Sequence, residues 1–310
     1  MVSVVNDLLK ELTKKELLDL ACQKRINVPV EWSRELIIEL LSLNISVNDI
    51  KKKKKTSSAM KPTGSIMLET RDLVKKFDDV IAVDKLNLEV MEGELFSLLG
   101  PNGAGKTTTI KILTGILKPT TGNATIAGFD VTENMNEIKK LIGVCPQEAA
   151  VFQFLNAKEN IELIGNLHSL SKSEIEKRTT GFLELLGLTE ASKRKAGGYS
   201  GGMLRKLNIM MALINDPKIA FLDEPTVGMD ARARRNTWEF IGSLKGENKT
   251  IILTTHYIEE AEELSDRVGI MDNGKLIEIG TPDELKSKYS ARNLEQVFLN
   301  ITGRRITEGL

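Results

Sequence analysis

The sequence predicts an α/β fold built around a parallel β-sheet. Short, almost continuously apolar runs occur at residues 95–99, 219–222 and 251–253, and such runs are typical of strands buried on both faces of a sheet. Segments with apolar residues at helical spacing separate these runs along the chain, and this alternation favours parallel strands. With 310 residues, the chain is long enough for about two domains.

The composition excludes several classes of protein. The 43 Lys and Arg residues balance 43 Asp and Glu residues, which disfavours a chain that binds nucleic acid over its whole surface. Two cysteines, Cys22 and Cys145, are too few for a disulfide framework or a cysteine-ligated zinc site, and they fit a reducing cytoplasm. No segment approaches the roughly 18 uncharged apolar residues of a membrane-spanning helix, and the charged N-terminal segment does not resemble a signal peptide. We therefore expect any membrane-spanning partner to be a separate chain.

A change in composition divides the chain into segments. Residues 51–65 are rich in Lys, Ser, Pro and Gly and lack apolar periodicity, so we expect a linker there. Before it, two capped apolar patterns predict a small helical module at residues 1–50. After it, residues 66–285 carry the α/β pattern, which is interrupted at about 148–202 by helical patterns that predict an inserted helical subdomain. We expect residues 286–310 to form a C-terminal helical extension.

Several single elements and side chains can also be assigned. An amphipathic helix is expected in the C-terminal extension, with apolar residues at helical spacing: Leu294, Val297, Phe298 and Ile301. The segment LRKLNIMMALI predicts a second amphipathic helix. We expect Cys145 and Trp238 to pack in the core, His168 to lie at the surface and Trp32 to anchor the N-terminal module.

A glycine-rich loop lies between a predicted strand and a predicted helix. It consists of Gly100, Pro101, Asn102, Gly103, Ala104, Gly105, Lys106, Thr107 and Thr108. Glycines let backbone N–H groups curl around phosphates at a helix N-terminus, whereas a chance glycine turn would lack these flanking elements. In such a loop Lys106 meets the β- and γ-phosphates of a nucleotide, and Thr107 offers its hydroxyl to Mg²⁺.

Two further motifs carry polar groups at the ends of elements. A buried strand ends in Asp223 and Glu224, where two acids cost desolvation unless a cation lies nearby. Asp223 is therefore a candidate for holding Mg²⁺ and Glu224 for polarising an attacking water, although such a pair alone is more often a helix cap or a surface pair. The residues Ser200, Gly201 and Gly202 precede a helix and offer a hydroxyl and backbone amides to a second phosphate, although alone they are a simple helix start.

The order of the motifs along the chain resembles that of the nucleotide-binding domains of ABC ATPases. The motifs are the phosphate loop, Gln147 after Pro146, the Ser-Gly-Gly-Met segment, the Asp-Glu pair and the later His256. The resemblance covers about residues 67–285. It implies a P-loop NTPase core, made of a RecA-like parallel sheet, an antiparallel β-subdomain and an inserted helical subdomain. It also implies ATP and Mg²⁺ as cofactors.

The resemblance assigns roles to individual residues. Gln147 would lie at the edge of the Mg²⁺, together with Thr107 and Asp223, and His256 would contact the γ-phosphate. Asp230, in the segment Gly-Met-Asp, would cross a dimer interface. Phe77 aligns with the aromatic residue that stacks on adenine, and its phenyl ring keeps the π-face. Met203 replaces the usual glutamine of the signature, while Ser200 and its glycines are kept.

The family resemblance further implies a dimer, homomeric or heteromeric, in which ATP joins the phosphate loop of one nucleotide-binding domain to the signature of a second, and hydrolysis releases them. The signature and the C-terminal segment 293–303 resemble the ATP-binding subunits of drug- and antibiotic-resistance exporters, whose permease is a separate polypeptide. This predicts a cytoplasmic protein that is peripheral on the inner face of the cell membrane.

The N-terminal residues allow a different hypothesis. Residues 1–50 resemble SAP-type helical modules, some of which bind DNA, and five lysines from Lys51 to Lys55 follow them. These lysines would bind the phosphates of nucleic acid or anionic lipid head groups, or they are simply a solvated linker. The alternative function is therefore a soluble ABC-type ATPase that acts on nucleic acid or the ribosome.

Overall fold

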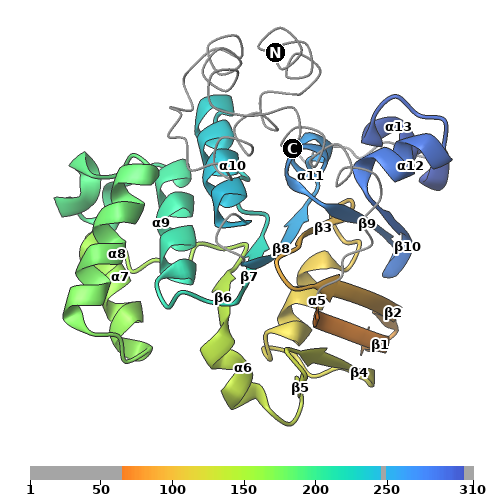
Figure 1. Cartoon of the computed structure of the whole chain (residues 1–310), viewed down its shortest axis with the longest axis horizontal. Helices are drawn as coiled ribbons and strands as arrows, with labels where there is room; N and C mark the ends of the chain where they lie inside the picture. Colours follow the sequence, from red (N-terminus) through yellow and green to blue (C-terminus); the bar gives the residue numbers. More distant parts are fainter. Residues whose placement is uncertain (1–64, 246–248, 304–310) are drawn as a thin grey trace, which may run out of the picture. The chain divides into compact units, whose positions relative to one another are not determined.

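The computed structural model describes residues 65–245 and 249–303 (Figure 1). The helical module predicted for residues 1–50, with Trp32, and the lysines from Lys51 to Lys55 lie outside the described residues. The same holds for residues 304–310 of the predicted C-terminal extension. The part of the chain described below is the α/β core and the helices attached to it.

The core is a six-stranded sheet with the strand order β10-β9-β3-β8-β7-β6, in which every neighbouring pair is parallel except β9 and β10. Its strands are β3 (Leu95–Leu99), β6 (Ile142–Cys145), β7 (Ile219–Asp223), β8 (Thr250–Thr255), β9 (Arg267–Asp272) and β10 (Lys275–Gly280). All residues of β3, β7 and β8 are buried, because successive side chains point to opposite faces and both faces are covered. The predicted parallel core is confirmed.

A second, antiparallel sheet has the strand order β2-β1-β4-β5. Its strands are β1 (Ile66–Phe77), β2 (Val80–Met91), β4 (Thr121–Ile126) and β5 (Phe129–Asp130). Together with α5 (Lys106–Leu113) and α6 (Met135–Leu141), it covers the face of the core sheet that carries Phe96, Leu98 and Phe221. This sheet is the antiparallel β-subdomain that the family resemblance implies.

Helices between β6 and β7 lie together at one side of the molecule in Figure 1. They are α7 (Ala157–Leu167), α8 (Lys172–Leu185) and α9 (Gly201–Leu213), with 3₁₀ turns at Glu190–Lys193 and Ala196–Gly198. Capping boxes begin α7 at Asn156 and α8 at Ser171, which explains where both helices start. The other face of the core sheet, with Leu222 and Leu253, packs against this side.

The helix α9 differs from its prediction. It contains the segment LRKLNIMMALI, which the sequence predicts to be amphipathic, yet every residue from Leu207 onward in the helix is buried. The cause is tertiary packing, because α9 lies against β6, β7 and α7. Even its polar residues Arg205 and Asn208 are buried, and both find hydrogen-bond partners.

The remaining helices are α10 (Ala231–Lys245), α11 (Ile258–Leu264), α12 (Pro282–Lys288) and α13 (Leu294–Thr302). The predicted C-terminal amphipathic helix is present as α13, which Asn293 caps and whose Leu294, Val297 and Phe298 are buried against Val268 and Ile270. Cys145 and Trp238 are buried and His168 is exposed, as predicted.

Replacing Phe298 with alanine is expected to lower the free energy of unfolding by about 3–5 kcal/mol, because the fully buried ring leaves a cavity under α13. Urea unfolding followed by circular dichroism measures the change. The exposed Glu295 on the same helix provides the control, and Glu295→Ala is expected to change the free energy by less than about 0.5 kcal/mol. Equal changes in the two variants would contradict a core role for α13.

Candidate functional site

The phosphate loop connects the carboxyl end of β3 to the first residue of α5, Lys106. Gly103 and Gly105 have φ angles of 81° and 102°, which are left-handed conformations that favour glycine. At Gly105 a Cβ atom would also lie 2.3 Å from the carbonyl oxygen of Ala82. The chain therefore needs glycine at this position to begin α5 close to β2.

The amine of Lys106 is held inside this loop. Its Nζ atom donates hydrogen bonds to the carbonyl oxygens of Gly100 (2.8 Å) and Pro101 (3.0 Å), and it lies 3.5 Å from Oε1 of Glu224. Burial lowers the pKa of Lys106, against the opposing effect of the Glu224 carboxylate. A positive charge is thus fixed within the curve of the loop, where phosphate oxygens would be its natural partners.

A second pair of side chains lies beside the start of α5. The Thr107 hydroxyl donates to Oδ1 of Asp223 (3.1 Å), and the hydroxyl of Thr254, on β8, donates to the same oxygen. Burial raises the pKa of Asp223, although both hydrogen bonds oppose this effect. A cation at this position would offset the cost of burying the carboxylate.

The donor set at Thr107 and Asp223 fits Mg²⁺. This ion takes oxygen ligands, and proteins that bind nucleotides supply one or two of them while the phosphates and water supply the rest. Within the described residues, no cluster of three or more Asp, Glu, His or Cys residues forms a cage for a metal ion. The residues therefore suit an ion that arrives with a nucleotide.

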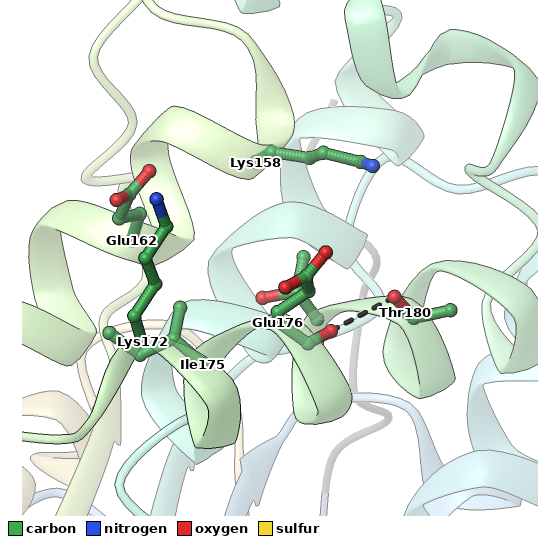
Figure 2. Close-up of a pocket in the computed structure, with 7 residues that line it drawn as sticks. Lys158, Glu162, Lys172, Ile175, Glu176 and Thr180 are labelled. Carbon is green, nitrogen blue, oxygen red and sulfur yellow. Dashed lines mark hydrogen bonds between the residues drawn. The ribbon is translucent and has the colours of Figure 1, made fainter.

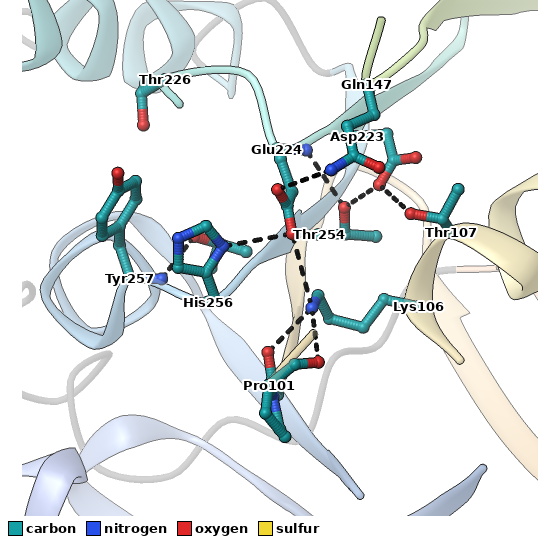
Figure 3. Close-up of polar contacts among 12 residues, drawn as sticks. Pro101, Lys106, Thr107, Gln147, Asp223, Glu224, Thr226, Thr254, His256 and Tyr257 are labelled. Carbon is teal, nitrogen blue, oxygen red and sulfur yellow. Dashed lines mark hydrogen bonds and ion pairs between the residues drawn. The ribbon is translucent and has the colours of Figure 1, made fainter. Parts of the chain in front are cut away.

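Glu224 lies at the centre of the site. Its Oε1 accepts a hydrogen bond from Nδ1 of His256 (3.2 Å), and its Oε2 accepts one from Nε2 of Gln147 (3.1 Å), as Figure 3 shows. Burial raises the pKa of Glu224, but the His256 hydrogen bond and the charge of Lys106 outweigh it, so the pKa lies below its usual value. The carboxylate is ionised at neutral pH and available as a base.

The backbone of Glu224 is strained and is held from two sides. Its φ angle is 48°, which is uncommon for a residue with a side chain. The Glu224 N–H donates to the carbonyl oxygen of Thr254 (3.0 Å), and the Glu224 carbonyl accepts from Nη2 of Arg205 (2.8 Å). Arg205 also donates to the carbonyl of Pro146 (2.8 Å), next to Gln147.

Sequence reasoning did not find Arg205 or Thr254. Arg205 is a buried cation in the helix α9, and an arginine within an otherwise apolar helical pattern was the available signal. Thr254 joins the site through the pairing of β7 with β8, which places it opposite Asp223. A single sequence does not reveal that register.

The structure brings together six of the predicted site residues, from the ends of neighbouring strands: Lys106, Thr107, Gln147, Asp223, Glu224 and His256. They follow β3, β6, β7 and β8, which are adjacent in the core sheet. The carboxyl edge of a parallel sheet is where α/β proteins bind their ligands.

Gly100 and Pro101 of the phosphate loop contact Lys106, whereas five other predicted site residues do not join this cluster. Among the described residues, no hydrogen bond or ion pair links Ser200, Gly201, Gly202, Asp230 or Phe77 to the side chains of Lys106, Asp223 or Glu224. Ser200 caps α9, and a Cβ atom on Gly202 would lie 3.6 Å from Met229, which places the signature beside the segment that ends at Asp230. The ring of Phe77 is half-exposed at the end of β1, with Nζ of Lys75 5.0 Å above it.

Comparisons with known proteins decide the family. A family model described as ABC transporter matches residues 83–227. The daunorubicin resistance ATP-binding protein DrrA3 of Streptomyces coeruleorubidus is 39% identical over 224 residues, which cover 72% of this chain and 71% of the relative. The chain belongs to the ABC transporter family.

Two further relatives agree with this assignment. The linearmycin resistance ATP-binding protein LnrL of Bacillus subtilis is 39% identical to this ABC protein over 76% of the chain and 75% of the relative. A solved dimeric ATP-binding cassette bound to ADP and Pi has a TM-score of 0.64 and 27% identity, and it covers 69% of this chain and 98% of that one. The chain is an ATP-binding protein with an ABC ATPase fold, and its enzymatic activity is ATP hydrolysis.

Two other features of this ABC ATPase lie outside the nucleotide site. None of its described helices is both long and apolar enough to cross a membrane. A shallow surface cavity lies between α7 and α8, and Figure 2 shows side chains from both helices around it. Its charged lining consists of two lysines and two glutamates: Lys158, Glu162, Lys172 and Glu176. This balanced lining favours neither an anion nor a cation.

Replacing Arg205 with methionine is expected to lower the free energy of unfolding by about 2–4 kcal/mol and to slow ATP hydrolysis, because the carbonyls of Pro146 and Glu224 lose a charged donor. Urea unfolding and a steady-state ATPase assay measure the two effects. Arg235 is exposed on α10, so Arg235→Met is the matched control. If Arg205→Met leaves both the free energy of unfolding and the rate of ATP hydrolysis unchanged, Arg205 does not hold the backbone of Glu224 in place.

Proposed function

We propose that this chain is the ATP-hydrolysing subunit of a drug or antibiotic exporter whose permease is a separate polypeptide. The observation that carries the proposal is the similarity to resistance ATP-binding proteins, which extends over more than two thirds of both chains. The alternative of a soluble ATPase that acts on nucleic acid or the ribosome receives no support from these relatives. Its candidate binding residues, 1–55, lie outside the described part of the chain.

Different site residues bind the phosphates of ATP and the Mg²⁺ ion. The loop from Gly100 to Thr108 binds the phosphates through backbone N–H groups and Lys106. Thr107, Asp223 and Gln147 would hold Mg²⁺, directly or through water. When bound, this ion neutralises charge that develops on the phosphate oxygens.

Glu224 and His256 act on the attacking water and on the γ-phosphate. Glu224 accepts a proton from the water, since its lowered pKa keeps it ionised and its two oxygens are oriented by His256 and Gln147. His256 is placed beside Glu224 to contact the γ-phosphate. Phe77 offers an exposed aromatic face to the adenine ring.

The active unit is a dimer of nucleotide-binding domains. Gly201 and Asp230 are exposed, and within the described residues no side-chain hydrogen bond joins the signature residues to their own phosphate loop. A second chain supplies the missing half of each site, with Ser200, Gly201 and Gly202 facing the γ-phosphate bound to the first chain. The similarity to a dimeric cassette supports this arrangement.

The permease docks beside Gln147. The segment between Gln147 and α7 carries Phe152 and Phe154, whose side chains are 53% and 86% exposed. Large apolar side chains with this exposure mark an interaction surface rather than a core. Gln147, at the start of this segment, donates to Glu224, so a partner bound to the segment would lie close in sequence to a residue that contacts the catalytic carboxylate. The protein would then lie on the cytoplasmic face of the cell membrane.

Replacing Glu224 with glutamine is expected to preserve ATP binding, to lower turnover by about 100-fold or more and to trap the dimer, because the base is lost while the nucleotide contacts remain. Equilibrium binding, an ATPase assay and sedimentation velocity with MgATP measure the three effects. Lys106→Ala is the counterpart and is expected to lose ATP binding itself. A monomeric Glu224→Gln protein under saturating MgATP would contradict the proposed dimer.

Replacing Phe154 with aspartate is expected to abolish co-purification with a polytopic membrane protein while the ATPase activity of the isolated chain is kept. The tagged chain would be extracted from host membranes in mild detergent and its partners identified by mass spectrometry. Leu185 is also exposed but belongs to α8 and not to this segment, so Leu185→Asp is the matched control. If the unmodified chain instead brings down nucleic acid or ribosomes that dissociate at raised salt, the exporter function is wrong.

A further inference from the structure

A buried carboxylate lies outside the nucleotide site and has no part in the mechanism above. Glu260, on α11, is completely buried. Its Oε1 atom accepts hydrogen bonds from the Thr226 hydroxyl (2.7 Å) and from Nε1 of Trp238 (2.9 Å). Thr226 is itself completely buried, so water does not compete for this bond.

The groups that meet at Glu260 come from two segments that the site uses. Thr226 follows Glu224 by two residues, on the segment that runs to Asp230 and into α10. Glu260 follows His256 by four residues, and Figure 3 shows Thr226 and Tyr257 on the segments that leave Glu224 and His256. The Glu260–Thr226 bond therefore ties the segment after Glu224 to the segment after His256.

A cation from α10 completes the cluster. The guanidinium of Arg234 lies 4.2 Å from the centre of the Tyr257 ring, next to His256. Burial holds the pKa of Glu260 above its usual value, against the opposing effects of the hydrogen bonds from Thr226 and Trp238 and of the charge of Arg234. The segment after β7 and the helix α10 thus both supply groups that act on this carboxyl group of α11.

Stabilisation of the fold does not by itself explain this buried polar cluster. Oε2 of Glu260 and Nε of Arg234 are buried and have no hydrogen-bond partner. A buried polar atom without a partner costs free energy, and an apolar side chain of similar volume often fills such a space at lower cost. Hydrogen bonds are directional, so Oε1 of Glu260 fixes the orientation of the Thr226 and Trp238 side chains.

We propose that Glu260 is a positioning residue for ATP hydrolysis, which holds the segment after Glu224 and the segment after His256 in register. The inference rests on the proposed function, because it takes Glu224 and His256 as the groups that act on the bound nucleotide. The bond between those two side chains spans 3.2 Å, so a displacement of about 1 Å in either segment breaks it. Through Thr226, the same carboxylate also fixes the start of the segment that carries Asp230.

Thr226→Val tests the proposal, because valine keeps the volume of threonine but removes the donor to Glu260. The expected result is a fall in kcat of about tenfold with the KM for ATP changed less than about twofold, since a buried hydrogen bond is lost away from the nucleotide contacts. Thr226→Ser restores a hydroxyl and is expected to recover kcat to within about twofold of the parent. Unfolding curves establish that each variant is folded at the assay temperature.

Thr114→Val provides the matched control. Thr114 is also a buried threonine, but its hydroxyl donates to the carbonyl of Ile110 in its own helix (2.8 Å). Its kcat is expected to stay within about twofold of the parent. A Thr226→Val protein with unchanged kcat, or with no rescue in Thr226→Ser, would overturn the positioning role.

The two proposals fail in different ways. Turnover per molecule of the unmodified chain, measured against protein concentration, tests the dimer: a rate that does not rise with concentration contradicts the proposed dimer. The ratio of kcat between Thr226→Val and the parent at one fixed concentration tests Glu260. That ratio tests the positioning role of Glu260 independently of whether the protein forms a dimer.

Discussion

The ion pair between Lys106 and Glu224 is the interaction on which the rest of the site depends. Both side chains are buried, so neither charge is tolerable without the other and without the hydrogen bonds around them. The carbonyls of the phosphate loop satisfy the amine, and His256 and Gln147 satisfy the carboxylate. A nucleotide that draws Lys106 towards its phosphates therefore alters the charge felt by Glu224, which couples binding to the state of the base.

The core sheet makes this arrangement possible. Four neighbouring strands deliver the loop of Lys106, then Gln147, Asp223 and His256 to one edge, and each strand is held on both faces by apolar packing. Every position of β3, β7 and β8 is buried, and the polar groups that form the site lie at or beyond the carboxyl ends of these strands. The ABC ATPase therefore combines a rigid interior with a site made entirely at its rim.

The sequence predicted the parallel core, the phosphate loop and the Asp223–Glu224 pair because each depends on local pattern: apolar runs, glycines before a helix, acids after a strand. It did not predict the burial of α9, which arises from packing against β6 and α7, or the part played by Arg205, which depends on the distant carbonyls of Pro146 and Glu224. The left-handed backbone of Glu224 was also hidden, because nothing in the residue type requires it. Thr254 was missed for a similar reason, as only the register of β7 and β8 places it beside Asp223.

The helix α9 has a mechanical consequence. Its first turn carries the signature at Ser200, and Arg205 grips the carbonyl of Glu224 from the same helix. These positions are five residues apart, which corresponds to a rise of about 7.5 Å along the helix. A helix segment of this length moves as a rigid body. In the proposed dimer, a nucleotide bound to the partner would contact Ser200 and could tilt α9 about its buried C-terminal end. Such a tilt would move Arg205 and, through its hydrogen bond, the strained backbone of Glu224. The position of the base in each copy would then depend on the nucleotide bound to the other copy.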